Sequence, residues 1–590
     1  MIPRLLFLDN ARCRVPTDHT SMNSRDEVYF LVAGATSGGQ QIKVAPDPNH
    51  DDEDYYPVSS GQSLGNLVLA QADMKEGDSL AFTVAMCEQD NAQLDAISDA
   101  IQGAIYAAIA FATEGATAPL AVEKFVQSGV DLVNSVTKSG DQVIAAFGVH
   151  VTIDHGNIRA QWIPMQSVGL TSTGDVKCKM TANGGDSNYD LSFSVVDASL
   201  MQVATAAVRL QGGSFKHVSL SVVSNGADVL PATVLETGDD SLLVQIWDQD
   251  KTSGQFTEKS RVKGQPATAL ATTAGSLGLA AAVQDKDSGK LKAILWGVDY
   301  HDKITWQDAA VLDTASAFAI TGMGSLIMRR LAVAAIGASN DLQISVWDQV
   351  LPSGSQTYKL KRLGDNGTDT VKAAHVAIAP WSKGVVTAIQ QHGSNHLQLI
   401  AWHVDDKGNV TRKGTSHATD AEIDQVAIVN TDLDRENIGN RLVTAVRESD
   451  KLLKVVVWDV AHDGTKFFRR DTDSPPAPAH VADLALAPMG PLVLIDKALV
   501  AAQVATAAVR LQGGKLRLCL WNISNNGRLS RAYDNDFEAV KEVSMDFWKI
   551  GTNTVGPPTP ESIVVAAAAM ADNSLVLFQF GASVNTIISG

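Results

Sequence analysis

The stretch VTAVRESDKLLKVVVWDV, residues 443–460, contains a unit that much of the chain repeats: a small apolar segment, a polar turn and a strand ending in an aromatic residue. The aromatic-ended strand occurs seven times, as LLVQIW to Trp247, LKAILW to Trp296, LQISVW to Trp347, LQLIAW to Trp402, LKVVVW to Trp458, LRLCLW to Trp521 and LVLFQF to Phe580. Successive aromatics are 49, 51, 55, 56, 63 and 59 residues apart. Periods of about 40–60 residues built from short strands predict a radial array of small sheets.

Two further segments precede each aromatic. The nearer one is small and apolar, at 231–234, 280–283, 333–336, 386–389, 443–446, 505–509 and 564–568. The earlier one is rich in Ala, Ser and Val, at 217–223, 266–271, 316–321, 375–380, 425–430, 482–488 and 543–548. Small side chains suit an innermost strand, where blades converge, and a large ring suits the wider gap further out. A fourth strand follows the aromatic, so residues 200–590 predict a seven-bladed β-propeller in an all-β protein.

The units read V-x-x-A, V-T-A-V-R, L-x-L-x-x-W and G-x-x-x-R in order, and residues 443–460 followed by FRR (468–470) fit this pattern best. They resemble the lectin-like seven-bladed propellers of the tectonin and Photorhabdus-lectin type. The resemblance implies a propeller that binds carbohydrate or another cell-surface ligand. It identifies no ligand residues, because the repeated positions are those that pack blades together.

One segment of twelve residues, QVATAAVRLQGG, occurs at both 202–213 and 503–514. The second copy is the second strand of a unit, whereas the first copy stands ahead of the first inner strand, in the phase of an outer strand. The last aromatic strand, 575–580, leaves no room for a further unit. We therefore predict that residues 203–210 close the ring by pairing with 575–580, unless the C-terminal segment 584–589 takes that edge.

Residues 1–199 break the period and predict a separate domain. Eight strand-like runs, at 4–9, 27–34, 65–70, 79–86, 143–153, 158–164, 176–182 and 189–196, predict an antiparallel β-sandwich. The order of DEVYF (26–30), GDSLAFTVAMCEQD (77–90) and GDQVIAAFGV (140–149) loosely resembles a C2-type domain. That resemblance implies calcium binding in acidic loops.

An insertion at about 92–137 has helical periodicity. Leu94, Ile97, Ile101, Ile105 and Ile109 repeat at three to four residues, and a second apolar series follows a break at Pro119. This predicts a helical hairpin. Either it packs against the sandwich or it enters a membrane, although neither arm has a basic face for anionic lipid.

The charge of the chain is concentrated in its first part. Residues 1–200 hold 11 Lys+Arg and 25 Asp+Glu, which gives −14 of the total −18, so the remaining residues carry −4. This acidity argues against nucleic acid as a partner and permits a divalent cation. The segment 45–56 supplies the candidate calcium ligands Asp47, Asp51, Asp52 and Asp54. A solvated acidic loop is the alternative.

The sequence assigns no catalytic residue, because it contains no HExxH, GxSxG or glycine-rich phosphate loop. Candidate ligand-binding residues are tryptophans outside the repeated position and acids that follow the repeated aromatics: Trp306, Trp381, Trp548, Asp248, Asp348 and Asp459. An aromatic ring can stack on a sugar, and a carboxylate can accept its hydroxyls.

We expect a non-enzymatic recognition protein that binds glycans or cell-surface glycoconjugates through the propeller. One alternative is a toxin whose propeller finds cells and whose hairpin acts on membranes. The other is a propeller hydrolase or lyase with carboxylates in the axial channel. With no signal peptide or spanning segment recognised, the expected location is the cytoplasm or, after non-classical export, outside the cell.

Overall fold

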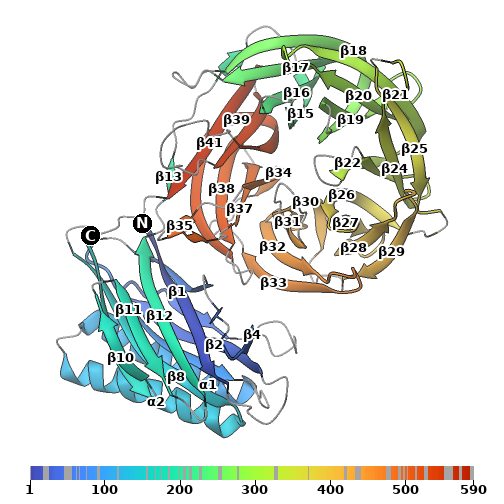
Figure 1. Cartoon of the computed structure of the whole chain (residues 1–590). Helices are drawn as coiled ribbons and strands as arrows, with labels where there is room; N and C mark the ends of the chain where they lie inside the picture. Colours follow the sequence, from blue (N-terminus) through green and yellow to red (C-terminus); the bar gives the residue numbers. More distant parts are fainter. Residues whose placement is uncertain are drawn as a thin grey trace.

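The computed structural model describes residues 2–584 with interruptions. The interruptions are 17–24, 46–55, 62, 65–66, 75, 89–93, 116–117, 155–156, 167, 175, 184–186, 198–199, 203–207, 211–214, 225–228, 250–255, 276–277, 324–329, 356, 368, 370, 417–421, 432–439, 474–479, 490–492, 496–497, 501–502, 512–513, 524–528, 550–561 and 571–573. A β-sandwich with two helices and a ring of sheets make up the chain (Figure 1).

The first part of the chain folds into two antiparallel sheets. One sheet contains β1 (Ile2–Val15), β5 (Ser63–Leu64), β6 (Leu67–Met74), β10 (Val168–Thr173), β11 (Lys177–Ala182) and β12 (Asn188–Asp197). The other contains β2 (Arg25–Thr36), β3 (Gln41–Val44), β4 (Tyr56–Ser59), β7 (Ser79–Glu88), β8 (Gln142–Asp154) and β9 (Asn157–Gln166). All eight predicted strands are present, and the four additional ones, β3, β4, β5 and β10, are short.

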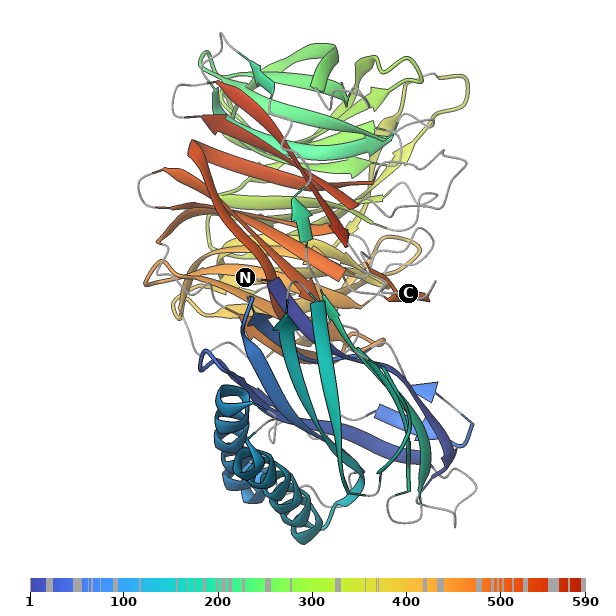
Figure 2. The same cartoon turned by 90° about the vertical axis from the view of Figure 1, so that its left-hand side faces the viewer.

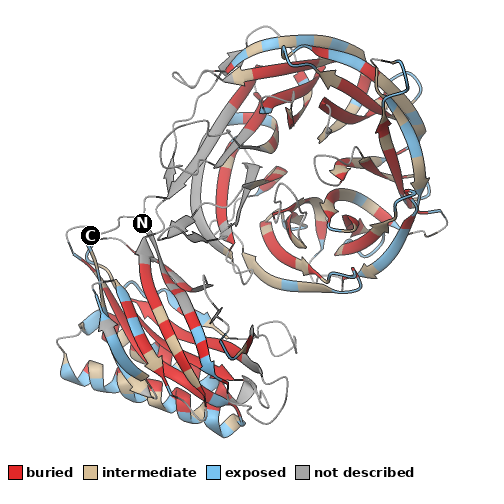
Figure 3. Ribbon diagram, viewed as in Figure 1, coloured by how far each residue is buried: buried red, intermediate tan, exposed pale blue. Residues whose placement is uncertain are grey.

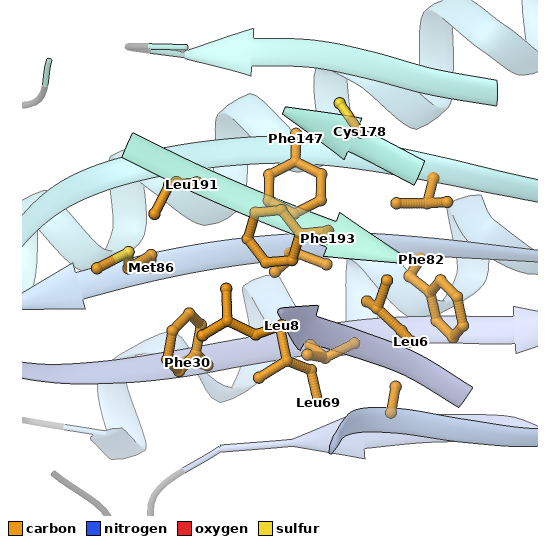
Figure 4. Packing of buried hydrophobic residues seen from close by; sticks show 14 of the residues in the cluster. Leu6, Leu8, Phe30, Leu69, Phe82, Met86, Phe147, Cys178, Leu191 and Phe193 are labelled. Carbon is orange, nitrogen blue, oxygen red and sulfur yellow. The ribbon is translucent and has the colours of Figure 1, made fainter. Parts of the chain in front are cut away.

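Alternating side chains of the two sheets meet in one apolar core (Figure 4). Leu6 and Leu8 of β1 face inward, as do Phe82 of β7 and Phe147 of β8, and each is at most 1% exposed. The Phe147 and Phe193 rings lie 4.7 Å apart between their centroids. A period of two along each strand therefore builds the sandwich.

The helical hairpin predicted between the fourth and fifth long strands is confirmed. It consists of α1 (Leu94–Glu114) and α2 (Pro119–Ser139), which lie along the outer face of the sheet that holds β2, β7 and β8 (Figure 2). Its apolar stripe forms a second core with that face, where Ile101 and Ile105 of α1 meet Leu31 of β2 and Ala85 of β7. Within the described residues, no helix is long and apolar enough to cross a membrane.

The second part of the chain forms the propeller, and its strands have the following bounds. The first fourteen are β13 (Leu200–Gln202), β14 (Val208–Leu210), β15 (Phe215–Ser224), β16 (Val229–Thr237), β17 (Ser241–Gln249), β18 (Phe256–Gly275), β19 (Gly278–Asp285), β20 (Lys290–Val298), β21 (Ile304–Thr314), β22 (Ala317–Met323), β23 (Arg330–Ile336), β24 (Leu342–Val350), β25 (Lys359–Asp365) and β26 (Ala373–Trp381). The others are β27 (Gly384–Gln391), β28 (Leu397–Val404), β29 (Val410–Thr415), β30 (Ile423–Asn430), β31 (Arg441–Glu448), β32 (Leu453–Val460), β33 (Phe467–Asp473), β34 (Val481–Met489), β35 (Val493–Ile495), β36 (Ala498–Val500), β37 (Gln503–Leu511), β38 (Lys515–Ile523), β39 (Leu529–Lys549), β40 (Ser562–Met570) and β41 (Leu575–Val584).

All of these strands except β35 and β36, which pair with each other, belong to seven blades, and the predicted propeller is confirmed. Blades 3, 4 and 5 are β22–β25, β26–β29 and β30–β33. The long strands β18 and β39 each serve two blades: β18 is the outer strand of blade 1 (β15–β18) and the inner strand of blade 2 (β18–β21), and β39 does the same for blade 6 (β34, β37–β39) and blade 7 (β39–β41). The inner strand of each blade contacts the inner strands of both neighbours, so the ring is closed.

The chain closes its ring with its own earlier segment, as predicted. Strand β14 pairs antiparallel with β41, with Val208 opposite Leu577 and Leu210 opposite Leu575. Strand β13 extends the same edge, with Leu200 opposite Val584. The segment just before the first inner strand thus supplies the outer strand of blade 7.

The repeated tryptophans fill the gaps between blades, as their regular spacing predicts. Trp247, Trp296, Trp402 and Trp521 are at most 1% exposed, and Trp347 and Trp458 at most 6%. In the six blades that carry them, the pairing of third and fourth strands is irregular beside the tryptophan. This bulge sends two consecutive outer-strand side chains to the same side of the blade.

Candidate functional site

Trp306 differs from every other tryptophan whose side chain the structure describes. It lies on β21, the outer strand of blade 2, and its side chain is 54% exposed. The other eight described tryptophan side chains are 6% exposed or less. A large exposed ring on an outer strand makes this edge a candidate for a binding surface.

The orientation of Trp306 follows from the strand around it. It pairs with the buried Trp296, and the bulge follows it in β21. Ile304, two residues earlier, packs in the core shared with blade 1, so strand alternation places the Trp306 indole on the blade 1 side. Beyond the bulge, Gln307 and Asp308 turn to blade 3, where they accept the amides of Tyr358 at 3.0 Å and Leu360 at 2.8 Å.

The turn that precedes β21 adds a second exposed ring. Tyr300 is 73% exposed, and its ring centroid lies 3.9 Å from that of His301. The amides of His301 and Lys303 both donate to Asp299 Oδ1 at 2.9 Å. These bonds, above all the one from Lys303, lower the pKa of Asp299 and fix the turn.

Blade 1 brings charged groups to the same edge. The Asp248 carboxylate accepts Lys259 Nζ at 2.8 Å, and this hydrogen bond raises the pKa of Lys259. Ser260 Oγ donates to the Asp302 carbonyl at 2.7 Å and accepts the Ile304 amide at 3.1 Å. Two adjacent residues of β18 thus connect Asp248 to the turn and strand that carry Tyr300 and Trp306.

We call this edge between blades 1 and 2 the rim site, made of Asp248, Lys259, Tyr300, His301 and Trp306. Two of its members, Asp248 of blade 1 and Trp306 of blade 2, were singled out from the sequence. Sequence reasoning missed Lys259, Tyr300 and His301. The polar turn DYHDK (299–303) between two strands was a signal for Tyr300 and His301, but not for Lys259, which lies on β18.

The exposure predicted for Trp381 is wrong. Its side chain is 1% exposed at the end of β26, where Nε1 donates to Asn440 Oδ1 of blade 5 at 3.1 Å. The ring also lies against Gly464, where an added Cβ would come within 2.6 Å of Trp381 Cη2. A tryptophan outside the repeated position therefore packs between blades 4 and 5.

The other candidate acids lie apart from the rim site. Asp459 accepts Arg441 at 2.8 Å and Arg470 at 2.7 Å. Burial would raise the pKa of Asp459, but its hydrogen bonds and the two guanidinium charges outweigh burial and lower it. Asp348 lies opposite Arg330 and Lys361 in register and makes no ion pair with a described residue.

Some candidates cannot be placed. Trp548 lies on β39 opposite Ile563, but its side chain is not described. The calcium candidates Asp47, Asp51, Asp52 and Asp54 fall outside the described residues. Among those described, no group of three His, Cys, Asp or Glu side chains could hold a metal ion.

Three carboxylates on inner strands bind neighbouring blades. Glu542 and Asp546 of β39 accept amides of β15, and Asp483 of β34 accepts Gln425 of β30 at 2.7 Å. The alternative of a propeller hydrolase or lyase called for carboxylates in the axial channel and named no residues. Each of these three carboxylates holds two blades together.

Comparison with known proteins identifies no family. No protein-family model matches the chain, and no curated protein sequence matches it. Solved structures with a similar fold include AofleA from Arthrobotrys oligospora, at 9% identity and a TM-score of 0.38 over 65% of this chain and 88% of that one. The six-bladed Aleuria aurantia lectin, described with a fucose recognition mode, has 9% identity and a TM-score of 0.34 over 64% and 100%. The Cps50 (Swd1) β-propeller domain of Myceliophteria thermophila has 11% identity and a TM-score of 0.36 over 64% and 99%. At these values the likeness carries no information about a ligand.

Proposed function

We propose that this protein recognises carbohydrate through the rim site of its propeller, without catalysing a reaction. The single observation that carries the proposal is the exposure of Trp306, 54% on a rigid outer strand, while the eight other described tryptophans are buried. A buried ring would be explained by packing. The exposed ring of Trp306 is accessible to a ligand.

The chemistry of the rim site suits a sugar. The face of an indole is flat and apolar, and it matches the C–H face of a pyranose ring. Lys259 and Asp248 offer a donor and an acceptor to hydroxyls, and Tyr300 offers a phenolic group that does both. A few polar groups around an aromatic surface are typical of ligand sites.

The experiment is a glycan array with the full chain and the variant Trp306→Ala. We expect wild type to bind a subset of glycans, and the variant to bind them at least about tenfold more weakly, because exposed aromatic anchors dominate small interfaces. Trp306→Phe should retain part of the binding. The matched control is Tyr106→Ala, which removes a 62% exposed ring from α1 and should leave binding unchanged.

Three outcomes would count against the proposal. Equal binding by wild type and Trp306→Ala would remove the rim site from the mechanism. Absence of glycan binding together with turnover of a substrate panel would favour the hydrolase alternative. Leakage of liposomes that depends on α1 and α2 would favour the toxin, although the apolar stripe of this hairpin is buried against the sandwich.

The N-terminal sandwich is proposed as a second surface-binding module of C2-like type that uses calcium. The charge of −14 in residues 1–200 supports this, as do the carboxylates of the segment 45–56. Calcium takes six to eight oxygen ligands from flexible loops, which such a segment can supply. For the propeller, the tectonin-type assignment rests on the repeated sequence pattern.

A further inference from the structure

The outer strands of blades 3, 4 and 5 carry a row of exposed cations. Each strand has two adjacent basic residues beside its bulge: Lys361 and Arg362 on β25, Arg412 and Lys413 on β29, and Arg469 and Arg470 on β33. All are exposed except Arg470, which pairs with Asp459. This clustering stands out in a chain whose net charge is −18.

Register places one member of each pair at a fixed position. Arg362 lies opposite Trp347, Arg412 opposite Trp402 and Arg469 opposite Trp458. Trp306 of the rim site occupies the same position in blade 2, opposite Trp296. A position that carries an exposed ring in blade 2 therefore carries a guanidinium in blades 3, 4 and 5.

The two members of a pair point to opposite sides of their strand. Each guanidinium lies on the side of its partner tryptophan, which packs against the preceding blade. On β29, Lys413 lies on the other side, near Gly464 of blade 5, where an added Cβ would be 3.2 Å from Lys413 Cβ. On β25, Lys361 follows the same alternation as Leu363, which packs towards blade 4.

Two neighbouring blade edges thus each receive a cation from both sides. Lys361 and Arg412 face the edge between blades 3 and 4, and Lys413 and Arg469 face the edge between blades 4 and 5. The members of each pair lie at different heights along their edge, since Gly364 lies beside Gly408 and Lys413 lies beside Gly464. Arg412 is paired with Asp369 at 2.9 Å. Within the described part of the chain, Lys361, Lys413 and Arg469 have no ion-pair partner.

We propose that these two edges form a binding surface for a linear anionic polysaccharide, whose sulfate or carboxylate groups contact Lys361, Arg412, Lys413 and Arg469 at separate points along the chain. The edges lie side by side around the circumference (Figure 3). One flexible polyanion can reach both, and linked weak contacts add to a useful affinity. Guanidinium groups suit the geometry of sulfate and carboxylate.

The shape and chemistry of this surface favour a polysaccharide over other polyanions. The edges follow the convex rim of the ring, so a flat bilayer cannot meet all of them at once, whereas a flexible chain can curve around them (Figure 1). Strands β25 and β29 present no exposed aromatic side chain on which a nucleic acid base could stack. This surface does not depend on the rim site.

The test uses the full chain and immobilised heparin as the probe. The triple variant Lys361→Gln, Lys413→Gln, Arg469→Gln should bind the immobilised heparin about 5- to 100-fold more weakly at 0.1 M salt, since each exposed charge contact contributes modestly. The loss should shrink as salt rises, because screening weakens such contacts. The matched control is Lys124→Gln, Lys138→Gln, Lys290→Gln, which removes the same charge from exposed positions elsewhere and should bind like wild type.

Equal heparin affinity in the two triple variants would overturn the proposal, because the effect would then be one of net charge. Tighter binding to DNA or to anionic vesicles than to heparin, with the same sensitivity to the three substitutions, would overturn the choice of a polysaccharide. The failure of this surface is distinguishable from that of the rim site. Trp306→Ala should keep heparin affinity, and the triple variant should keep its neutral glycans.

Discussion

The backbone N–H of Val222 donates a 2.8 Å hydrogen bond to the carboxylate of Asp546, which lies 324 residues further along the chain. Two more bonds have the same separation: Leu220 N–H to Ser544 Oγ at 2.9 Å and Val218 N–H to Glu542 Oε2 at 3.2 Å. Alternate side chains of β39 thus cap successive free amides along the edge of β15. This polar ladder joins the first blade to the last near the axis, while β14 joins them at the outside.

Removal of the Asp546 carboxylate should therefore loosen the ring. We expect Asp546→Ala to lower the free energy of unfolding by about 1–3 kcal/mol, because a buried amide loses a charged acceptor. Urea unfolding of the full chain measures this. Asp287→Ala, which removes an exposed carboxylate from the turn between β19 and β20, is the control, and equal midpoints for both variants would contradict the prediction.

A threonine next to the buried tryptophan should stabilise each blade that has one. Trp247, Trp402 and Trp458 donate Nε1 to Thr233, Thr387 and Thr444 at 2.9–3.0 Å. We expect Thr444→Val to cost about 1 kcal/mol, since the shape is kept and the hydrogen bond is lost. If the cost is unchanged in a Trp458→Phe background, the bond is not its cause.

In blade 2 the hydrogen bond to the buried tryptophan can be added instead of removed. Trp296 Nε1 is buried and has no hydrogen-bond partner among the described residues, and Ala281 stands where blades 1, 4 and 5 have threonine, opposite the residue two before the tryptophan. Ala281→Thr should raise the free energy of unfolding by about 1 kcal/mol relative to Ala281→Val. The valine variant separates the effect of added volume from that of the new acceptor. Equal stability of the two would contradict the prediction.

The stability of the ring closure should depend on pH through His217. The hydrogen bond from His217 Nδ1 to Glu542, at 3.2 Å, raises the pKa of His217 above its ordinary value, and Glu236 adds to this. Because the pKa of His217 is raised in the folded state, its protonation stabilises the fold fully below the unfolded pKa of about 6.5. This stabilisation is lost as the pH rises through the folded pKa. Thermal melting from pH 5.5 to 9 should show this decline, reduced because the side chain is partly solvated. Glu542→Gln should flatten the profile, and a profile unchanged in that variant would count against the role of His217.

Calcium binding by the acidic segment stays a prediction of the sequence. Calorimetry at millimolar calcium should show heat, and a chelator should lower the melting temperature of the sandwich. Asp51→Asn with Asp52→Asn should abolish both effects, because calcium affinity depends on the number of charged ligands. Absence of heat, together with an unchanged melting temperature in chelator, would contradict the predicted calcium binding.

The sequence could predict the blades because their strands are defined locally. A period of two, small residues in the inner strand and a terminal tryptophan are each visible within one unit, and packing between blades uses the same positions every time. Ring closure was also predicted, since the phase of 203–210 is that of an outer strand, although the sequence also allowed the segment 584–589 as an alternative partner for the same edge. The blades and the ring closure both follow from the order of the strand segments along the chain.

The site could be predicted only in part, because exposure depends on the neighbouring blade. Trp306 and Trp381 both stand outside the repeated position, yet Asn440 and Gly464 of the next blade cover Trp381. No residue within the repeat unit around Trp381 indicates that blade 5 buries its side chain. Lys259 lies at the rim site because of a bulge in the pairing of β17 and β18. The sequence of one strand alone does not indicate this bulge.

The helical hairpin leaves and rejoins the sandwich at a single point of one sheet, because Glu88 at the end of β7 pairs with Gln142 at the start of β8. A short turn could therefore replace residues 89–141 without changing the order of any strand. Such a minimal sandwich would keep its topology but present Tyr29, Leu31 and Cys87 of the outer face to water, all of them fully buried at present. The hairpin is thus an insertion between two paired strands. It covers a second apolar face of the domain, which would otherwise be a site of aggregation.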